Sequence, residues 1–520
     1  MCSPETRVAT GAKSWRPSAH DAPFFRIRQE SGRIVTEGSP RCEAGHLGKI
    51  RGDTDPFVAW NWDGSRLQVW NDRYGFQPLF YWTGAAGDLI ISTSLHRLLE
   101  LGAPTEIDTD ALAAFFRLGF FLGEDTPFKS IRLLPPNACM SWQDGELNVS
   151  GSYRILCERP IRREAAMDGY IELFREAIRR RPPCGSLAVP LSGGRDSRHI
   201  FLELCERGWL PNGAISVRFE PYLMTDDVKI AALLAKEAGV RHLVWDTPQN
   251  TIEREWRKNI ETHMSTTEHG WIPTVTDDLG ASFDTLYEGV AGDWLSTCLA
   301  NSEERQSRLE RGELEWLAES LLGDEGYLPK ALPVEQYRLM SRDAARARLI
   351  RELRRHTEAA NPLGSFMLWN RCRRVTGLAP TCLWNQCRMI WCPYLDGDLF
   401  DFLSALPARV LLSAEYHQFH TDTIIRAYPR FAHIPFAGKM SKRVSVPAYE
   451  RRLLRDLARA AVSLGDSTLL RKSYLYPRLL RGFIDSRYGT EIPGLAKFSV
   501  YLLQLEALQK RKSGIPVASL

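Results

Sequence analysis

The sequence predicts an α/β fold, in which a β-rich N-terminal unit precedes a parallel α/β domain with C-terminal helices. Residues 187–191 form a short apolar run, and a glycine turn joins it to apolar residues at helical spacing from His199 onward. Two further strand patterns, residues 214–220 and 241–246, lie on either side of a helix pattern at 226–239. Short apolar strands that alternate with helices are typical of a parallel sheet.

The N-terminal unit is expected to be rich in strands from about residue 57 to residue 153. Residues 57–63 and 66–71 flank a Gly-Ser turn, which is the pattern of a β-hairpin. A helix is predicted at residues 95–101, and Asp108 is placed to cap a second helix. This mixture of hairpins and short helices differs from the regular alternation that follows it.

Composition narrows the possible classes of protein. The chain has 520 residues, enough for two domains, which we predict at residues 1–155 and 160–520. Apolar residues make up 44% of the chain, and the net charge of +4 gives no indication of nucleic-acid binding. The polar start lacks the apolar core of a signal peptide, and no apolar run is long enough for a membrane span. The 11 cysteines are scattered and odd in number, which fits a reducing cytoplasm. Cys372, Cys382, Cys387 and Cys392 fall close together without a Cys-x-x-Cys pair, so we interpret them as buried thiols.

The turn after residues 187–191 carries the side chains of a phosphate site. Gly193 and Gly194 allow the backbone to approach a phosphate, and the following helix directs its N–H groups there. Ser192 and Ser197 add hydroxyl donors, and Asp196 can hold the Mg²⁺ that phosphates carry. A tight turn without any ligand is the alternative interpretation.

This turn resembles the Ser-Gly-Gly-x-Asp-Ser loop of the ATP pyrophosphatases, which cleave ATP between the α and β phosphates. Residues 72–81 (Asp-Arg-Tyr-Gly-Phe-Gln-Pro-Leu-Phe-Tyr) resemble the amidotransferase domain of asparagine synthetases. From about residue 57 to residue 443, the order of elements resembles the asparagine synthetase superfamily, which includes β-lactam synthetases, carbapenam synthetases and lasso-peptide cyclases. The resemblance implies an Ntn-hydrolase-like first domain, of the class II amidotransferase type, and an ATP-pyrophosphatase second domain.

A second element of the superfamily resembles residues 288–294 of this chain. The family pattern is Ser-Gly-Glu-Gly-x-Asp-Glu, and here it is Glu-Gly-Val-Ala-Gly-Asp-Trp. The resemblance implies that Asp293 holds Mg²⁺ together with Asp196, and that Gly289 lies against the pyrophosphate. Val290 stands where asparagine synthetases carry a glutamate beside the acyl-adenylate. A surface-turn aspartate, or an alignment shifted by one residue, is the alternative.

The same resemblance assigns the adenine wall and a catalytic cation. Leu191 and Val217, at the ends of the first two strands, match the family's adenine wall, although both are also ordinary core residues. The family places a lysine that stabilises the adenylation transition state near Pro435. Lys439 and Lys442 are the candidates, and the distance of Lys442 from Pro435 fits better.

Glutamine hydrolysis by the first domain is not expected. Cys2 occupies the position of the N-terminal nucleophile of class II glutaminases, whose own amine acts as base. The family start resembles Met-Cys-Gly-Ile, whereas here Ser and Pro follow Cys2, and no Asn-Gly-Glu-Ile-Tyr-Asn segment precedes Phe57. The stretch before Phe57 is also too short for the usual strands of a glutamine pocket. The sequence therefore predicts a degenerate domain that is retained as a scaffold.

The resemblance implies an amide ligase that uses ATP and Mg²⁺ to activate a carboxylate as an acyl-adenylate, with release of pyrophosphate and then AMP. Without glutamine hydrolysis, the attacking amine is expected on the substrate itself. This favours a cyclase of the lasso-peptide (macrolactam) or β-lactam type, with a precursor peptide as candidate substrate and a protease of the same biosynthetic cluster as candidate partner. An asparagine synthase fed by glutamine or ammonia, and a catalytically silent scaffold, are the alternatives.

Overall fold

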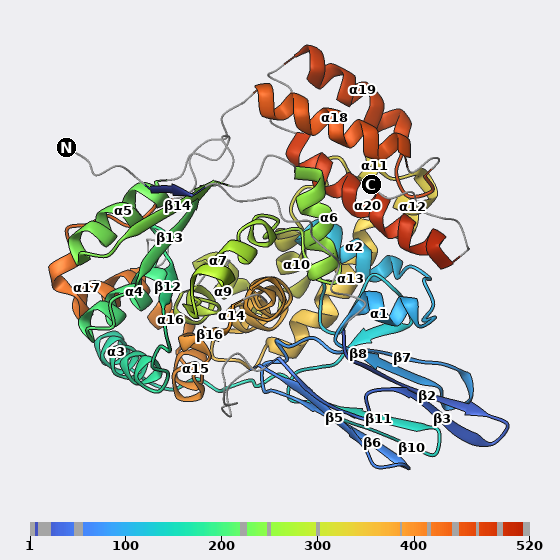
Figure 1. The fold of residues 1–520 in the computed structure, drawn as a ribbon, viewed down its shortest axis with the longest axis horizontal. Helices are drawn as coiled ribbons and strands as arrows, with labels where there is room; N and C mark the ends of the chain where they lie inside the picture. The colour runs from blue at the N-terminus through green and yellow to red at the C-terminus, as the bar shows by residue number, and fades with distance from the viewer. Residues whose placement is uncertain are drawn as a thin grey trace.

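The chain folds into a β-sheet domain, a parallel sheet with its helices, and a further group of helices (Figure 1). The structure, a computed structural model, describes residues 6–8, 22–45, 56–218, 226–246, 251–297, 302–384, 387–412, 418–438, 447–463, 467–485 and 492–512. Within these segments, no helix combines the length and the apolar character that a membrane crossing requires.

Two five-stranded antiparallel sheets make up the N-terminal domain. One has the order β11-β10-β6-β5-β4 and the other the order β3-β2-β8-β7-β9. The strands are β2 (Phe24–Glu30), β3 (Arg33–Gly38), β4 (Arg41–Ala44), β5 (Val58–Trp62), β6 (Arg66–Asn71), β7 (Phe80–Thr83), β8 (Leu89–Ser92), β9 (Ile131–Leu133), β10 (Cys139–Gln143) and β11 (Glu146–Ser150). The hairpin predicted across the Gly-Ser turn is confirmed as β5 and β6.

The two sheets pack face to face around an apolar core that includes Phe25, Trp60 and Trp142, all fully buried. Helices α1 (Leu95–Glu100) and α2 (Thr109–Leu118) cover the second face of the β7–β8 sheet. Asp108 caps α2 as predicted, because its side chain accepts the N–H of Ala111. The Ntn-hydrolase-like arrangement itself stays a prediction.

Three described strands of this domain, β2, β3 and β4, precede Phe57, so the expectation that the β-rich unit begins near residue 57 is wrong. Their apolar pattern is weak. In β2 only Phe25 and Ile27 are fully buried, and β3 is exposed along nearly its whole length. Strand β2 pairs with β8, and β4 pairs with β5. The hydropathy pattern of the sequence does not indicate this pairing.

The second sheet system has six strands, all parallel, in the order β1-β14-β13-β12-β15-β16. Its strands are β1 (Thr6–Val8), β12 (Leu187–Pro190), β13 (Gly213–Arg218), β14 (His242–Asp246), β15 (Thr285–Tyr287) and β16 (Met389–Trp391). The alternation of strands and helices thus correctly indicated a parallel sheet. Strand β1 comes from the first ten residues, although the sequence assigns residues 1–155 to the first domain.

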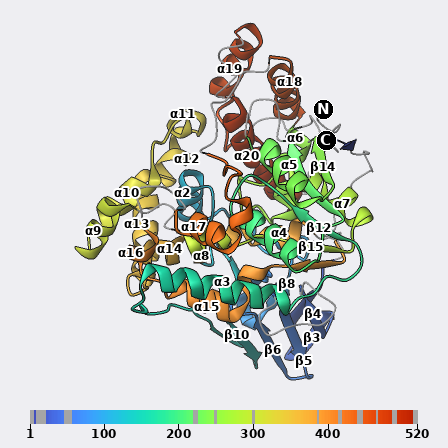
Figure 2. The ribbon, with the colours of Figure 1, turned by 90° about the vertical axis from the view of Figure 1, so that its left-hand side faces the viewer.

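Helices cover this sheet and connect its strands. Helix α4 packs against β12 and α5 against β13 and β14, while α3 lies along α15 and α17 (Figure 2). These helices are α3 (Arg163–Arg179), α4 (Asp196–Glu206), α5 (Asp227–Ala238), α7 (Thr276–Ser282), α8 (Gly292–Ser296), α15 (Gly397–Ser404), α16 (Ala408–Leu411) and α17 (Gln418–Ala427). Helix α5 ends at Gly239, whose φ of 71° is the left-handed conformation that glycine adopts without strain.

The remaining helices form a layer that joins the two domains. Helix α20 packs against α6 and α18, and α13 packs against α2 of the first domain. They are α6 (Thr251–Glu261), α9 (Glu303–Glu310), α10 (Leu314–Leu322), α11 (Leu328–Ala331), α12 (Val334–Leu339), α13 (Arg342–Leu353), α14 (Pro362–Met367), α18 (Pro447–Ser463), α19 (Lys472–Ile484) and α20 (Ile492–Lys512). A shared apolar core runs through this layer and α2.

The motif at residues 72–81 has a structural role in the described chain. The buried carboxylate of Asp72 accepts three backbone hydrogen bonds, from the N–H groups of Phe57, Tyr74 and Gly75, at 2.7 to 2.9 Å. Burial raises the pKa of Asp72 to about 6. The carboxylate therefore fixes the turn between β6 and β7.

That turn also fastens the first domain to the second. The hydroxyl of Tyr74 donates a hydrogen bond of 2.6 Å to the carbonyl of Leu395, and Arg73 forms an ion pair with Asp401 of α15. From the other side, the buried guanidinium of Arg373 donates to the carbonyls of Gly75 and Leu134. The two domains are thus joined by polar contacts at buried and half-buried positions.

Replacing Asp72 by alanine is expected to lower the free energy of unfolding by about 3 kcal/mol or more, because three buried N–H groups lose their acceptor. Asp63→Ala is the matched control, since Asp63 also accepts three hydrogen bonds, from Ser65 and Arg66, but is exposed. Urea unfolding of both variants measures the difference. Equal losses in the two variants would contradict the role given to Asp72.

Candidate functional site

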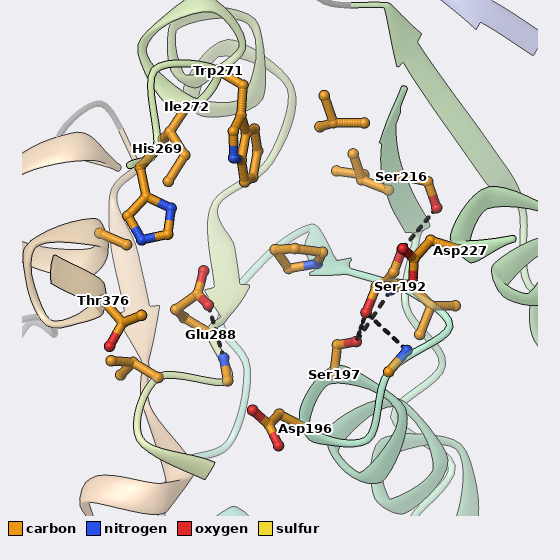
Figure 3. Close-up of a pocket in the computed structure, with 18 of the residues that line it drawn as sticks. Ser192, Asp196, Ser197, Ser216, Asp227, His269, Trp271, Ile272, Glu288 and Thr376 are labelled. Carbon is orange, nitrogen blue, oxygen red and sulfur yellow. Dashed lines mark hydrogen bonds between the residues drawn. The ribbon is translucent and has the colours of Figure 1, made fainter. Parts of the chain in front are cut away.

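A cavity of about 330 Å³ lies at the carboxyl ends of β12, β13, β14 and β15, where open parallel sheets bind ligands (Figure 3). One wall is the turn between β12 and α4. The facing wall consists of the β15–α8 turn, the segment around His269 and Trp271, and the π-helical turns η5 (Leu368–Thr376) and η6 (Ala379–Leu383). The cavity therefore collects segments that are up to about 190 residues apart in sequence, Ser192 and Trp384 among them.

The turn after β12 is closed by its own hydroxyl groups. The N–H of Ser192 donates to the hydroxyl of Ser197, and the N–H of Gly194 donates to that of Ser192, both at 3.1 Å. The N–H of Gly193 donates at 2.9 Å to the carboxylate of Asp227, in the first turn of α5. An anionic group is thus already bound by one backbone N–H of this turn. Helix α4 begins at Asp196, three residues earlier than its apolar spacing predicts.

Two glycines allow the β15–α8 turn to approach Asp196 closely. A Cβ atom on Gly289 would lie 2.9 Å from Cβ of Asp196, and one on Gly292 would lie 2.7 Å from its Cγ. The N–H of Asp293 donates to Oδ2 of Asp196 at 3.1 Å. The structure therefore brings together the two aspartates that the sequence proposes as metal ligands.

Burial makes the charged forms of both aspartates costly. It raises the pKa of Asp196 well above its ordinary value, and the charge of Asp293 raises it further. Burial also raises the pKa of Asp293 to about 6. Oδ1 of Asp196 is buried without a hydrogen bond and lies 3.4 Å from Nδ1 of His420. A cation beside these oxygens would offset both costs.

Mg²⁺ in proteins is commonly held by one or two carboxylates together with substrate phosphates and water. Asp196 and Asp293 match that donor set. Across the described residues, no group of three His, Cys, Asp or Glu side chains is placed to hold a metal ion by itself. The nine described cysteines are free. Of the four predicted to be buried thiols, Cys372, Cys382 and Cys392 are buried, and Cys387 is half-buried.

Glu288 is a further carboxylate of this cavity, beside Asp196, Asp227 and Asp293, and the sequence did not indicate it. Trp384 donates its indole N–H to Oε2 at 2.8 Å, and the N–H of Gly289 donates to Oε1 at 3.0 Å. Burial raises the pKa of Glu288 to about 7. The family pattern has serine at the position of Glu288, so the motif comparison gives this glutamate no role. Its position directly after β15 was the available signal.

The cavity has two unlike halves. The serine turn and Asp227 line one half, and Figure 3 shows His269, Trp271 and Ile272 in the other, together with Glu288 and Thr376. The rings of Trp271 and Trp384 lie 5.9 Å apart at 69°. Burial lowers the pKa of His269 to about 4, so its ring is neutral at pH 7. An apolar or aromatic group fits this half.

Most of the residues proposed from sequence line this cavity. They are Leu191, Ser192, Gly194, Asp196, Ser197, Val217, Gly289 and Asp293. Gly193 lies in the same turn, and Val217 is paired in register with Trp245 of the neighbouring strand, which also lines the cavity. Val290 faces the cavity too. Lys439, Lys442 and Cys2 lie outside the described residues.

Replacing Glu288 by glutamine is expected to change how stability depends on pH. The folded-state pKa of about 7 lies above the ordinary 4.5, so folded Glu288 keeps a proton that the unfolded chain releases between these values. Wild-type stability therefore falls as the pH rises through this window, by on the order of 3 kcal/mol, whereas glutamine does not titrate.

Urea unfolding at about pH 4 and about pH 8 tests this expectation. Relative to wild type, the free energy of unfolding of Glu288→Gln should be higher at about pH 8 than at about pH 4. Glu315→Gln, on the exposed side of α10, controls for the loss of a carboxylate as such. A difference between wild type and Glu288→Gln that is the same at both pH values would contradict the raised pKa.

Comparison with known proteins identifies one domain. Residues 47–154 match the family model of the glutamine amidotransferase domain. A search of the curated proteins finds no match to the chain. The matched range includes β5 to β11, with α1 and α2, and the Asp72 turn. The N-terminal β-sheet domain therefore carries a glutamine amidotransferase domain, consistent with the N-terminal domain of asparagine synthetase-type proteins.

Proposed function

We propose that this chain is an ATP-dependent amide ligase. It activates a substrate carboxylate as an acyl-adenylate with release of pyrophosphate, and an amine then displaces AMP. The observation that carries the proposal is the approach of Asp293 to Asp196 beside the serine turn, at the carboxyl edge of a parallel sheet. The amidotransferase match in the first domain supports it, because such domains accompany amide-forming enzymes of the asparagine synthetase type.

The nucleotide occupies the half of the cavity that the serine turn lines. Adenine rests against Leu191 and Val217, and the phosphates accept hydrogen bonds from the hydroxyls of Ser192 and Ser197 and the N–H of Gly194. These donors now bond to one another, so each exchanges an internal partner for a phosphate oxygen. Helix α4 directs its N-terminus at the same point.

Asp196 and Asp293 would hold Mg²⁺, which supplies positive charge against the phosphates when bound. Their raised pKa values and the unpartnered Oδ1 of Asp196 fit a site that a cation completes. Lys442, or Lys439 as the second candidate, stabilises the charge that builds at phosphorus during adenylation. Both lysines follow Ala437, whose N–H donates to the carbonyl of Gly193 in the serine turn.

Within this class we favour a cyclase of the lasso-peptide or β-lactam type. Val290 cannot bind ammonium or move a proton, so free ammonia is a poor match for the site. An amine carried by the substrate needs no glutamine hydrolysis. A precursor peptide then supplies both carboxylate and amine, and a protease of the same cluster prepares it.

A second candidate is an asparagine synthase, and the amidotransferase match at residues 47–154 favours it. In that case the first domain supplies ammonia from glutamine. A silent scaffold is the weakest candidate. Buried carboxylates without a cation lower stability, and a protein without a ligand has no reason to keep Asp196, Asp293 and Glu288 in one cavity.

Asp196→Asn and Asp293→Asn are each expected to abolish AMP formation with the fold intact, because an amide lacks the charge that holds Mg²⁺. Calorimetric titration with ATP in MgCl₂ should show at least about tenfold weaker binding. AMP release is followed with L-aspartate and with short peptides as acyl donors. Asp226→Asn is the matched control, because Asp226 is exposed and does not line the cavity. Wild-type turnover in either test variant would remove that carboxylate from the metal site.

Cys2→Ala is expected to leave glutamate release from glutamine unchanged. Without the Asn-Gly segment, the oxyanion of the tetrahedral intermediate lacks its donor, a loss of about 3 kcal/mol or more. Glutamate is measured in the purified protein with and without ATP, and Cys139→Ala, at an exposed thiol of the same domain, is the control. Release that depends on Cys2 would instead establish a working glutaminase and favour the asparagine synthase.

A further inference from the structure

The carboxylate of Glu288 has unused hydrogen-bonding capacity on its cavity side. Each of its oxygens accepts one hydrogen bond, from Trp384 or from Gly289, whereas a carboxylate offers about four acceptor positions. Glu288 lines the cavity, and Figure 3 shows the carboxylate directed into it, on the side of His269 and Trp271. A donor on a ligand can therefore reach this carboxylate directly.

Among the described residues, no cation lowers the pKa of Glu288. The groups that lower that pKa are the indole N–H of Trp384 and the N–H of Gly289, and both are neutral. A buried carboxylate in this situation is costly unless a positive group joins it. The chemistry that would satisfy it is an ammonium group, which brings a positive charge and three donors.

The surroundings of Glu288 also suit a cation that carries an apolar group. Trp384 donates its indole N–H to Glu288, and the ring of Trp271 lies 5.9 Å from that of Trp384 at 69°. Indole faces attract ammonium groups. Ile272 and Val275 continue the same wall. Ammonia would leave this apolar wall without a partner, whereas an aliphatic or aromatic amine would cover it.

We propose that Glu288, with Trp271 and Trp384, forms the binding site of the substrate amine and that Glu288 is the base that takes its proton. This inference rests on the proposed ligase function and assigns its second substrate: a primary amine on an apolar or aromatic group. Val290, two residues later, takes no part in proton transfer. Asparagine synthetases are expected to carry a glutamate at the position of Val290. In this chain Glu288 would supply the carboxylate instead.

The proposed step balances as follows. The ammonium gives one proton to the carboxylate of Glu288 and becomes the free amine. The nitrogen lone pair forms the C–N bond to the adenylate carbonyl, and the bond between that carbon and the phosphate oxygen breaks, with its electron pair leaving on AMP. The second proton passes from nitrogen to the phosphate of the departing AMP. The base therefore works best with a pKa near neutrality.

Binding of benzylamine tests the site without knowledge of the natural substrate. Wild-type protein is titrated with benzylamine by calorimetry, with benzyl alcohol as the neutral analogue. We expect wild type to bind benzylamine more tightly than benzyl alcohol, and Glu288→Gln to bind benzylamine about tenfold or more weakly. Affinity for ATP with MgCl₂ should stay within about twofold of wild type in this variant.

The pH dependence of benzylamine binding distinguishes the effect of the charge of Glu288 from the effect of the shape of the cavity. The other charged or titratable groups that line this cavity are Arg195, Asp196, Asp227, His269 and Asp293. The charge of Glu288 raises the pKa of Asp196 and that of Cys387. Only a change that disappears in Glu288→Gln therefore reports on Glu288. Benzylamine affinity should rise between about pH 6 and about pH 8 in wild type and stay level in the variant.

A second variant covers the case in which Glu288→Gln does not fold. Trp384→Phe keeps an aromatic ring but removes the N–H that stabilises the charged carboxylate. It should move the midpoint of benzylamine binding to higher pH, since Trp384 lowers the pKa of Glu288. An unchanged midpoint would contradict the assignment.

Outcomes against this inference differ from outcomes against the ligase. Equal benzylamine affinity in wild type and Glu288→Gln, or no binding by wild type, overturns the amine site. Parallel loss of ATP affinity in Glu288→Gln also overturns it, by placing Glu288 in the nucleotide site. Failure of wild type to bind ATP with MgCl₂ counts against the ligase instead, while the benzylamine titration still decides the role of Glu288.

Discussion

The close contact between the β15–α8 turn and Asp196 is the constraint on which the rest of the site depends. Strands β12 and β15 are neighbours in register, with Ala188 opposite Leu286, so the turns that follow them start side by side. Only glycine at 289 and 292 lets the second turn close on Asp196. The backbone N–H of Asp293 then bonds the carboxylate directly. Any side chain at either glycine would move Asp196 or open the turn, because there is no free volume between them.

Four carboxylates, those of Asp196, Asp227, Glu288 and Asp293, line one cavity and set its electrostatic character. Burial raises the pKa of Asp196, Asp293 and Glu288, and the charges of Arg195 and Arg371 offset this only in part at the two aspartates. The folded protein therefore carries a cost that ligands would relieve, a metal ion at the aspartates and an ammonium at Glu288. Glu288 lies on the His269 side of the cavity (Figure 3), and its charge raises the pKa of Asp196. A metal ion and an ammonium would thus be held in one cavity, as a reaction between a phosphate-bearing group and an amine requires.

The first domain is fixed to the second independently of any glutamine chemistry. Tyr74 and Arg73 bond to the segment at Leu395 and Asp401, and Arg373 returns two hydrogen bonds to the first domain. Arg73 and Tyr74 belong to the amidotransferase match. Their contacts explain how such a domain can be retained as a scaffold. It buries one side of the helical layer that carries the π-helical turns at the cavity, so its loss would expose apolar core.

The sequence by itself determined the parallel sheet, the β5–β6 hairpin and the turn at residues 192–197. Apolar periodicity and glycine placement are local properties, so they can be interpreted without knowing which segments pack against them. Only the tertiary structure decided that β2 to β4 pair at all, that β1 joins the parallel sheet, and that Glu288 shares a cavity with Asp196. Strand pairing and burial are made by residues far apart in the chain. The pKa of Glu288 and its possible partners follow from that burial, which no local pattern encodes.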